Sequence, residues 1–121
     1  MEPLANTVPT AATSSQSTSI TKAFIRELLL QNDPDGYIAN CNVIANAITP
    51  DYKTIKAPFM IIAGEEDKSA PLEGCRHIFE NVVDSEFKKM EVLEKCGHWH
   101  CIEASDRVGP LVAKFCAEVE P

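Results

Sequence analysis

The sequence predicts an α/β protein in which a helical segment precedes a βαβα unit with parallel strands. In residues 20–50, apolar side chains recur at three- and four-residue spacing, the pattern of one helix face. In residues 51–121, two short apolar runs alternate with helical patterns, and a strand–helix–strand unit of this kind has parallel strands and a right-handed crossover. Residues 1–19 are rich in Ser, Thr, Ala and Pro without a period, so we expect a flexible or extended lead-in.

The composition is globular and acidic. Of 121 residues, 45% are hydrophobic and 24% are charged, and 11 Lys and Arg against 18 Asp and Glu give a formal net charge of −7. Nucleic-acid binding depends on cations that neutralise phosphates, so this balance argues against a nucleic-acid partner. The longest apolar run, Ala57–Ala63, is far below the roughly 20 residues that span a bilayer, so no membrane partner is expected.

The N-terminus and the cysteines predict a cytoplasmic protein. The first residues have neither the basic start nor the apolar core of a secretory signal. An odd number of irregularly spaced cysteines predicts reduced thiols rather than a disulfide framework. The five are Cys41, Cys75, Cys96, Cys101 and Cys116.

Two helices are predicted in the first half. Ser19 precedes the first, whose apolar face contains Ile20, Phe24, Ile25, Leu28 and Leu29. Asp33 is a suitable N-cap for the second, with Pro34 at its first position. Its apolar face contains Tyr37, Ile38, Cys41, Ile44 and Ala45, and Pro50 lies beyond its end.

The second half begins with a strand at Ala57–Gly64, whose continuous apolar run predicts cover on both faces. A helix follows at 71–83. The second strand, at 86–94, is expected to turn Phe87, Met90, Val92 and Leu93 inward. The last helix occupies 104–120, with Ser105 as its expected N-cap and Val108, Leu111, Val112, Phe115 and Val119 on its apolar face.

Acids and imidazoles gather at one edge of this predicted sheet. The loop after the first strand contains Glu65, Glu66 and Asp67, and the loop after the second contains His98 and His100. Parallel strands end at the same edge, and neighbouring strands lie about 4.8 Å apart, so a carboxylate and an imidazole can meet there. Such a pair fixes the imidazole tautomer for acid–base catalysis. The alternative for each residue is an ordinary solvated loop side chain.

These segments resemble an α/β-hydrolase. "IKAPFMIIAGEEDKSAP" (55–71) resembles the strand that leads to the triad acid, and "EVLEKCGHWHCIEASDRV" (91–108) resembles the last core strand, the Gly-His of the base and the Glu that opens the final helix. The resemblance implies that Asp67 is the triad acid and His98 the base. Glu65 and Glu66 are then expected to be solvated loop acids.

The first half resembles the helical lid of fungal hydrolases related to 3-oxoadipate enol-lactonases. The resemblance therefore extends over the whole chain, with residues 20–50 as the lid and 51–121 as the C-terminal part of the core. It implies a small ester or lactone substrate and no cofactor. Phe24 and Tyr37 are candidates for lining the substrate pocket, although no motif selects them.

The nucleophile motif of the family is not found in these residues. It is a Ser in G-x-S-x-G on a strand-to-helix turn, and no serine or cysteine here has that frame. Covalent acyl transfer needs both base and nucleophile, so we expect this chain alone, a truncated hydrolase, to be inactive. The alternative is a non-catalytic protein that associates with itself or a relative through an exposed sheet edge and the lid helices.

The remaining residues of "CGHWHC" have weaker assignments. Trp99 is expected to pack, or to contact a substrate, and His100 to pack or hydrogen-bond beside it. Cys96, His98, His100 and Cys101 are zinc-type ligands. However, the cluster lacks the two separated pairs of a tetrahedral site, so no metal is predicted.

Overall fold

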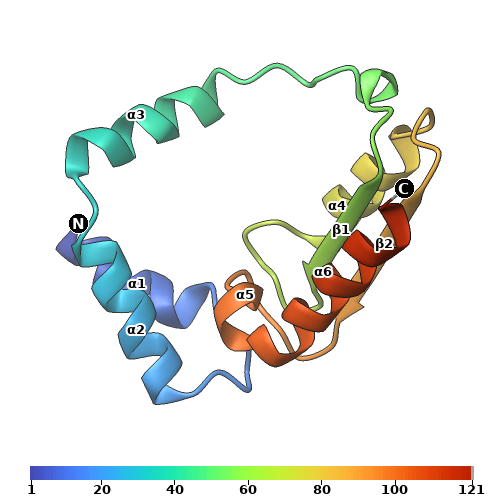
Figure 1. The fold of residues 1–121 in the computed structure, drawn as a ribbon. Helices are drawn as coiled ribbons and strands as arrows, with labels where there is room; N and C mark the ends of the chain where they lie inside the picture. Colours follow the sequence, from blue (N-terminus) through green and yellow to red (C-terminus); the bar gives the residue numbers. More distant parts are fainter. Residues whose placement is uncertain (121) are drawn as a thin grey trace.

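The computed structural model describes residues 1–120. The helices and strands that the sequence predicts are all present, and α1, η1 and α5 occur in addition (Figure 1). The elements are α1 (Glu2–Ala11), α2 (Ser19–Leu30), α3 (Pro34–Ala45), the 3₁₀ helix η1 (Tyr52–Thr54), β1 (Phe59–Gly64), α4 (Leu72–Asn81), β2 (Lys88–Leu93), α5 (His100–Glu103) and α6 (Ser105–Val119).

The prediction of a flexible or extended lead-in is wrong for most of residues 1–19. Residues 2–11 form α1, which packs along α2 (Figure 1). Ala5 of α1 and Ile25 and Leu29 of α2 form one buried cluster. The Ser, Thr and Pro residues give this segment a low helix propensity, so the sequence did not indicate a helix. The short amphipathic helix α1 is stabilised by its tertiary contact with α2 rather than by residue propensity.

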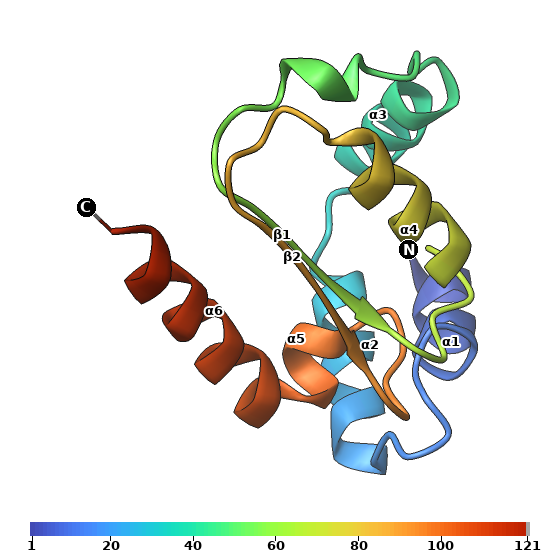
Figure 2. The same ribbon diagram turned by 90° about the vertical axis from the view of Figure 1, so that its right-hand side faces the viewer.

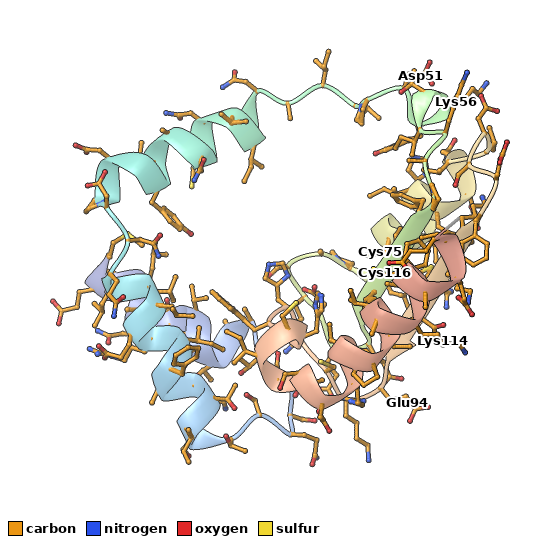
Figure 3. All side chains as sticks on the ribbon, in the orientation of Figure 1. Asp51, Lys56, Cys75, Glu94, Lys114 and Cys116 are labelled. Carbon is orange, nitrogen blue, oxygen red and sulfur yellow. The ribbon has the colours of Figure 1, made fainter. Side chains whose placement is uncertain are left out.

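The two predicted lid helices form with side-chain N-caps. The hydroxyl of Thr18, one residue before the expected Ser19, accepts a hydrogen bond from the N–H of Thr21, and Asp33 accepts from the N–H of Gly36. No residue of α3 is buried in the described part of the chain, and its side chains project freely (Figure 3). Asp51 and Lys56, labelled in Figure 3, lie on the long connection from α3 to β1.

The sheet consists, within residues 1–120, of β1 and β2 in parallel. Phe59 lies opposite Lys88, and Gly64 lies opposite Leu93, so both strands end at the same edge. Figure 2 shows α4, the connection between the two parallel strands, on one face of the sheet and α6 on the other.

The core of the α/β part lies between the end of β2 and the start of α6. It contains Leu93, Cys96, Ala104 and Val108. The expectation that Val92 points inward with Leu93 is wrong, because Val92 is 40% exposed. Successive side chains of a strand point to opposite faces. Because Leu93 points into this cluster, Val92 points away from it.

The start of the last helix also differs from the prediction. Ser105 is the first residue of α6, and the N-cap is Ala104, which makes no side-chain cap. Ala104 is not helical (φ −139°, ψ 39°), and it separates α5 from α6. Its carbonyl accepts hydrogen bonds from the N–H groups of Arg107 and Val108, so Ala104 takes the N-cap position one residue before Ser105.

Among the helices of residues 1–120, none combines the length and the apolar character that a bilayer crossing requires.

Candidate active site

Two loops meet at the edge where the strands end: the β1–α4 loop (residues 65–71) and the β2–α5 loop (residues 94–99). The N–H of Glu65 donates to the carbonyl of Leu93 over 2.9 Å, and the N–H of Glu66 donates to the carbonyl of Cys96 over 2.8 Å. The first bond continues the parallel ladder beyond the strands, and the second joins the two loops directly.

Two glycines allow the backbones to approach closely here. A Cβ on Gly64 would lie 2.5 Å from the carbonyl oxygen of Cys96, and a Cβ on Gly97 would lie 2.7 Å from the backbone nitrogen of Ser14. Neither glycine has a positive φ, so space, not backbone conformation, requires glycine. Contacts below 3.0 Å are essentially never made by a real Cβ. A side chain at Gly64 would therefore force the two loops apart, and one at Gly97 would push the β2–α5 loop away from residues 12–14.

Asp67 and His98 face each other across these loops. His98 Nδ1 lies 2.9 Å from Asp67 Oδ2. The Asp67 side chain is 5% exposed, whereas that of His98 is 45% exposed. The other carboxylate oxygen, Oδ1, accepts hydrogen bonds from the N–H groups of Ser69 (2.8 Å) and Ala70 (2.9 Å). The acid is thus fixed by the backbone while the imidazole remains accessible.

The electrostatics favour an ionised acid. Burial by itself would raise the pKa of the Asp67 carboxyl, but hydrogen bonds from Ala70, His98 and Ser69 outweigh it and hold the pKa below its ordinary value. A carboxylate on Nδ1 assigns the proton of the neutral imidazole to that nitrogen. Nε2 of His98 is then free to accept a proton from another group.

A pocket of about 740 Å³ lies beside His98, between the helices and the two loops. It is lined by Val8, Ala11, Ala12, Leu29, Asn32, Tyr37, Asn40, Lys68, Ser69, His98 and Trp99. A smaller hollow of about 300 Å³ is lined by His98, Trp99, Cys101 and Ile102. Of the two lid side chains expected at a pocket, Tyr37 lines the larger one, whereas Phe24 does not and is 52% exposed.

Trp99 and His100 differ in position. Trp99 packs against the α1–α2 cluster, as expected, and it also lines the pocket. His100 is the first residue of α5, and within residues 1–120 its Nδ1 is buried without a hydrogen-bond partner. The expected hydrogen bond beside Trp99 is therefore not formed through that nitrogen.

Glu65 is exposed, as the sequence predicts, and Glu66 is partly exposed, but both carboxylates also accept specific hydrogen bonds. Glu65 accepts a hydrogen bond from the N–H of Lys95 over 3.0 Å, and Glu66 accepts two from Ser15. Sequence reasoning missed these roles because the partners lie 30 and 51 residues away. No pattern in the residues around Glu65 and Glu66 indicates these hydrogen bonds.

Among the described residues, no serine or cysteine is hydrogen-bonded to His98, and no cluster of metal ligands is found. In residues 1–120, the His98 side chain hydrogen-bonds to Asp67 alone. The pocket contains Ser69, but its hydroxyl is not hydrogen-bonded to His98, and Ser15 donates its hydroxyl to Glu66. The same residues contain no group of three or more His, Cys, Asp or Glu side chains that could hold a metal ion.

The structure is similar to three solved hydrolases over nearly all of this chain. The enol-lactonase of Burkholderia xenovorans LB400 matches with a TM-score of 0.85 and 25% identity, over 97% of this chain and 45% of that one. A thermophilic esterase of Thermogutta terrifontis shares the fold with a TM-score of 0.83 and 18% identity, over 98% of this chain and 44% of that one. A serine hydrolase involved in carbazole degradation shares it with a TM-score of 0.78 and 17% identity, over 97% of this chain and 47% of that one. The chain has the fold of the C-terminal part of an α/β-hydrolase.

Curated relatives of similar sequence are hydrolases of the same type. A 2-hydroxy-6-oxononadienedioate/2-hydroxy-6-oxononatrienedioate hydrolase of Pseudomonas is 36% identical over 64 residues, covering 53% of this chain and 22% of that protein. A 2-hydroxymuconate semialdehyde hydrolase of Pseudomonas putida is 29% identical over 70 residues (58% and 24%). The chain thus spans about a quarter of the length of these relatives. No protein-family model matches it.

Proposed function

We propose that this chain supplies the acid, the base and the lid of a serine-type hydrolase of small esters or lactones. The observation that carries the proposal is the 2.9 Å contact between His98 Nδ1 and Asp67, at the edge of a parallel sheet and beside a pocket. Residues 20–50 act as the lid, and 51–121 as the C-terminal part of the core. No cofactor takes part.

In this proposal, His98 moves protons at Nε2 while Asp67 holds Nδ1. The nucleophile is a serine outside these 121 residues. Its hydroxyl proton passes to Nε2 as the serine oxygen bonds to the substrate carbonyl carbon, and Asp67 stabilises the resulting imidazolium. Nε2 then returns the proton to the leaving oxygen as the carbon–oxygen bond breaks. A water molecule repeats the sequence and releases the acid.

The pocket supports a small, partly polar substrate. Apolar side chains such as Val8, Leu29 and Trp99 share its wall with Asn32 and Lys68. Its volume of about 740 Å³ lies in the range of small-molecule sites. The relatives described as an enol-lactonase and an esterase support the ester or lactone class. In this proposal Trp99 contacts the substrate.

The first test uses the 121-residue chain alone. Without the nucleophile we expect no hydrolysis of p-nitrophenyl esters or enol-lactones and no labelling by a serine-directed fluorophosphonate, because the base has nothing to activate. Turnover that disappears in His98→Ala would contradict this expectation. Glu80→Gln, an exposed change on α4, is the control for charge alone.

The second test uses the native protein of the source, detected with an antibody against α6. We expect a species more than twice the 13.3 kDa of this chain that the fluorophosphonate labels. In that species His98→Ala should lower kcat/KM by about 10⁴-fold or more. A native species of 13.3 kDa without label would refute the proposal.

A second candidate function is association with another copy or a relative. Each strand of the sheet pairs on one side only within residues 1–120, and α3 exposes Ile38, Val43 and Ile44. Unpaired strand edges and apolar helix faces are docking surfaces. Analytical ultracentrifugation should then find dimers in the micromolar range. A purely monomeric chain would rule this candidate out.

A reducing compartment suits the cysteines. All five are free thiols in the structure, and we propose a cytoplasmic location on that basis. Fractionation of the source, with detection by the same antibody, tests it. Recovery of the protein with secreted or membrane fractions would contradict it.

A further inference from the structure

A short stretch of chain, the bridging segment (Ala12–Ser15), lies between α1 and both loops of the candidate site. Two carboxylates accept its backbone N–H groups. Glu103 Oε2 lies 2.7 Å from the nitrogen of Ser14, and Glu66 Oε2 lies 2.6 Å from the nitrogen of Ser15. Glu66 adjoins Asp67 in the β1–α4 loop, whereas Glu103 ends α5.

The hydroxyl of Ser15 adds a further bond. Its Oγ lies 2.8 Å from Glu66 Oε1, so both oxygens of this carboxylate are bound to one residue. Bonds from N–H and O–H groups to an ionised carboxylate are shorter and stronger than neutral ones. In agreement, the hydrogen bonds from Ser15 lower the pKa of Glu66, which stays ionised at neutral pH.

The bridging segment is also bound directly to the backbone of the base. The N–H of His98 donates to the carbonyl of Ala12 over 2.9 Å. Gly97 fits against the backbone of Thr13 and Ser14 with no room for a side chain. The bridging segment is also joined to α1, because the Thr13 hydroxyl donates to the carbonyl of Pro9 over 2.6 Å. Ala12, Thr13 and Ser14 are buried, so this is not a loose linker.

We propose that Glu66 and Glu103 are positioning residues for His98 and act through the bridging segment. By holding the N–H groups of Ser15 and Ser14, they fix the Ala12 carbonyl that receives the His98 N–H. The same contacts join α1 to the two loops, so the lid and the Asp67–His98 geometry are coupled. The catalytic consequence rests on the proposed function, but the geometric coupling does not.

The test measures two signals of His98 by NMR in the 121-residue chain, and neither depends on turnover. The first is hydrogen exchange of the His98 backbone N–H, which reports the bond to Ala12. The second is the downfield Nδ1–H resonance, which reports the bond to Asp67. Glu66→Ala should speed exchange of the His98 N–H about tenfold or more, the factor expected from losing charge-assisted bonds, and should broaden the Nδ1–H resonance.

Four further variants separate positioning from stability. Glu66→Gln keeps an oxygen acceptor for Ser15 and should restore part of the protection. Glu80→Gln makes the same charge change on the exposed face of α4 and should leave both signals unchanged. Val82→Ala removes a fully buried side chain remote from the loops, and should lower the melting temperature without changing the Nδ1–H resonance. If Glu66→Ala fails to fold, Ser15→Ala removes only the hydroxyl bond and should give a smaller increase in exchange.

The outcomes distinguish this inference from the proposed function. If Glu66→Ala and Glu103→Gln behave like Val82→Ala, with lower stability but unchanged His98 signals, the positioning role is wrong. If the wild-type chain lacks the Nδ1–H resonance, the Asp67–His98 pair fails and the proposed function with it. Exchange of the His98 N–H then still decides whether the carboxylates hold the β2–α5 loop.

Discussion

Replacing Gly64 by alanine tests whether close packing of two loops holds the Asp67–His98 pair together. The added Cβ would meet the carbonyl oxygens of Gly97 and Cys96, both of them backbone atoms. Backbone cannot rotate out of the way as the end of a side chain can. The β2–α5 loop, which contains His98, must therefore move away from the β1–α4 loop.

The required movement follows from the distances. Ordinary contact begins at 3.4 Å, and the Cβ would lie 2.5 Å from the Cys96 oxygen and closer still to the Gly97 oxygen, so the loops must separate by at least about 0.9 Å. Added to the 2.9 Å between His98 Nδ1 and Asp67 Oδ2, this exceeds the upper limit of about 3.2 Å for a good N–H···O bond. Overpacking of this kind costs about 1–3 kcal/mol, which lowers the melting temperature by roughly 4–12 °C.

Thermal unfolding followed by circular dichroism and the Nδ1–H resonance of His98 are the assays. Gly64→Ala should lower the melting temperature and remove the resonance. Gly74→Ala is the matched control: it lies on α4 with no atom within 4 Å of its would-be Cβ, so it should be neutral or stabilising by up to about 1 kcal/mol. A Gly64→Ala protein that keeps both wild-type stability and the resonance would refute the reasoning.

Three other predictions follow from the same structure. The pKa of Asp67 lies below its ordinary value of 3.8 in the folded state, so its contribution to stability is present above that pH and is lost as the pH falls through the folded pKa. Urea denaturation from pH 7 to about pH 3 should therefore show a steeper loss for wild type than for Asp67→Asn, and equal slopes would contradict this. Ile25→Ala should cost about 2–5 kcal/mol because Ile25 is fully buried between α1 and α2, whereas Ile20→Ala, at an 83% exposed position, should change the free energy of unfolding by less than about 0.5 kcal/mol. Burial raises the pKa of the Cys96 thiol, so a thiol reagent should label the exposed Cys101 in the native state and Cys96 only after unfolding; rapid native labelling of Cys96 would be inconsistent with its burial.

The meeting of Asp67 and His98 is predictable from sequence because it depends on a regular geometry. Each residue follows a strand by a few positions, and parallel strands end at one edge. The start of α3 is likewise local, since Asp33 caps this helix through its own side chain. What could not be predicted is which neighbouring acids serve structure: Glu66 and Asp67 are adjacent, yet one binds Ser15 and the other His98.

The sequence by itself determined the α/β class, the βαβα order and the acid and imidazole at one sheet edge, because periodicity and strand direction are encoded in residues close together along the chain. Only the tertiary structure decided that the N-terminal residues form α1 and that the bridging segment is bound by Glu66 and Glu103. Those hydrogen bonds join residues 51 and 89 positions apart. A pattern of neighbouring residues has no means to specify such a pairing, because it arises only when α1, both loops and α5 pack together.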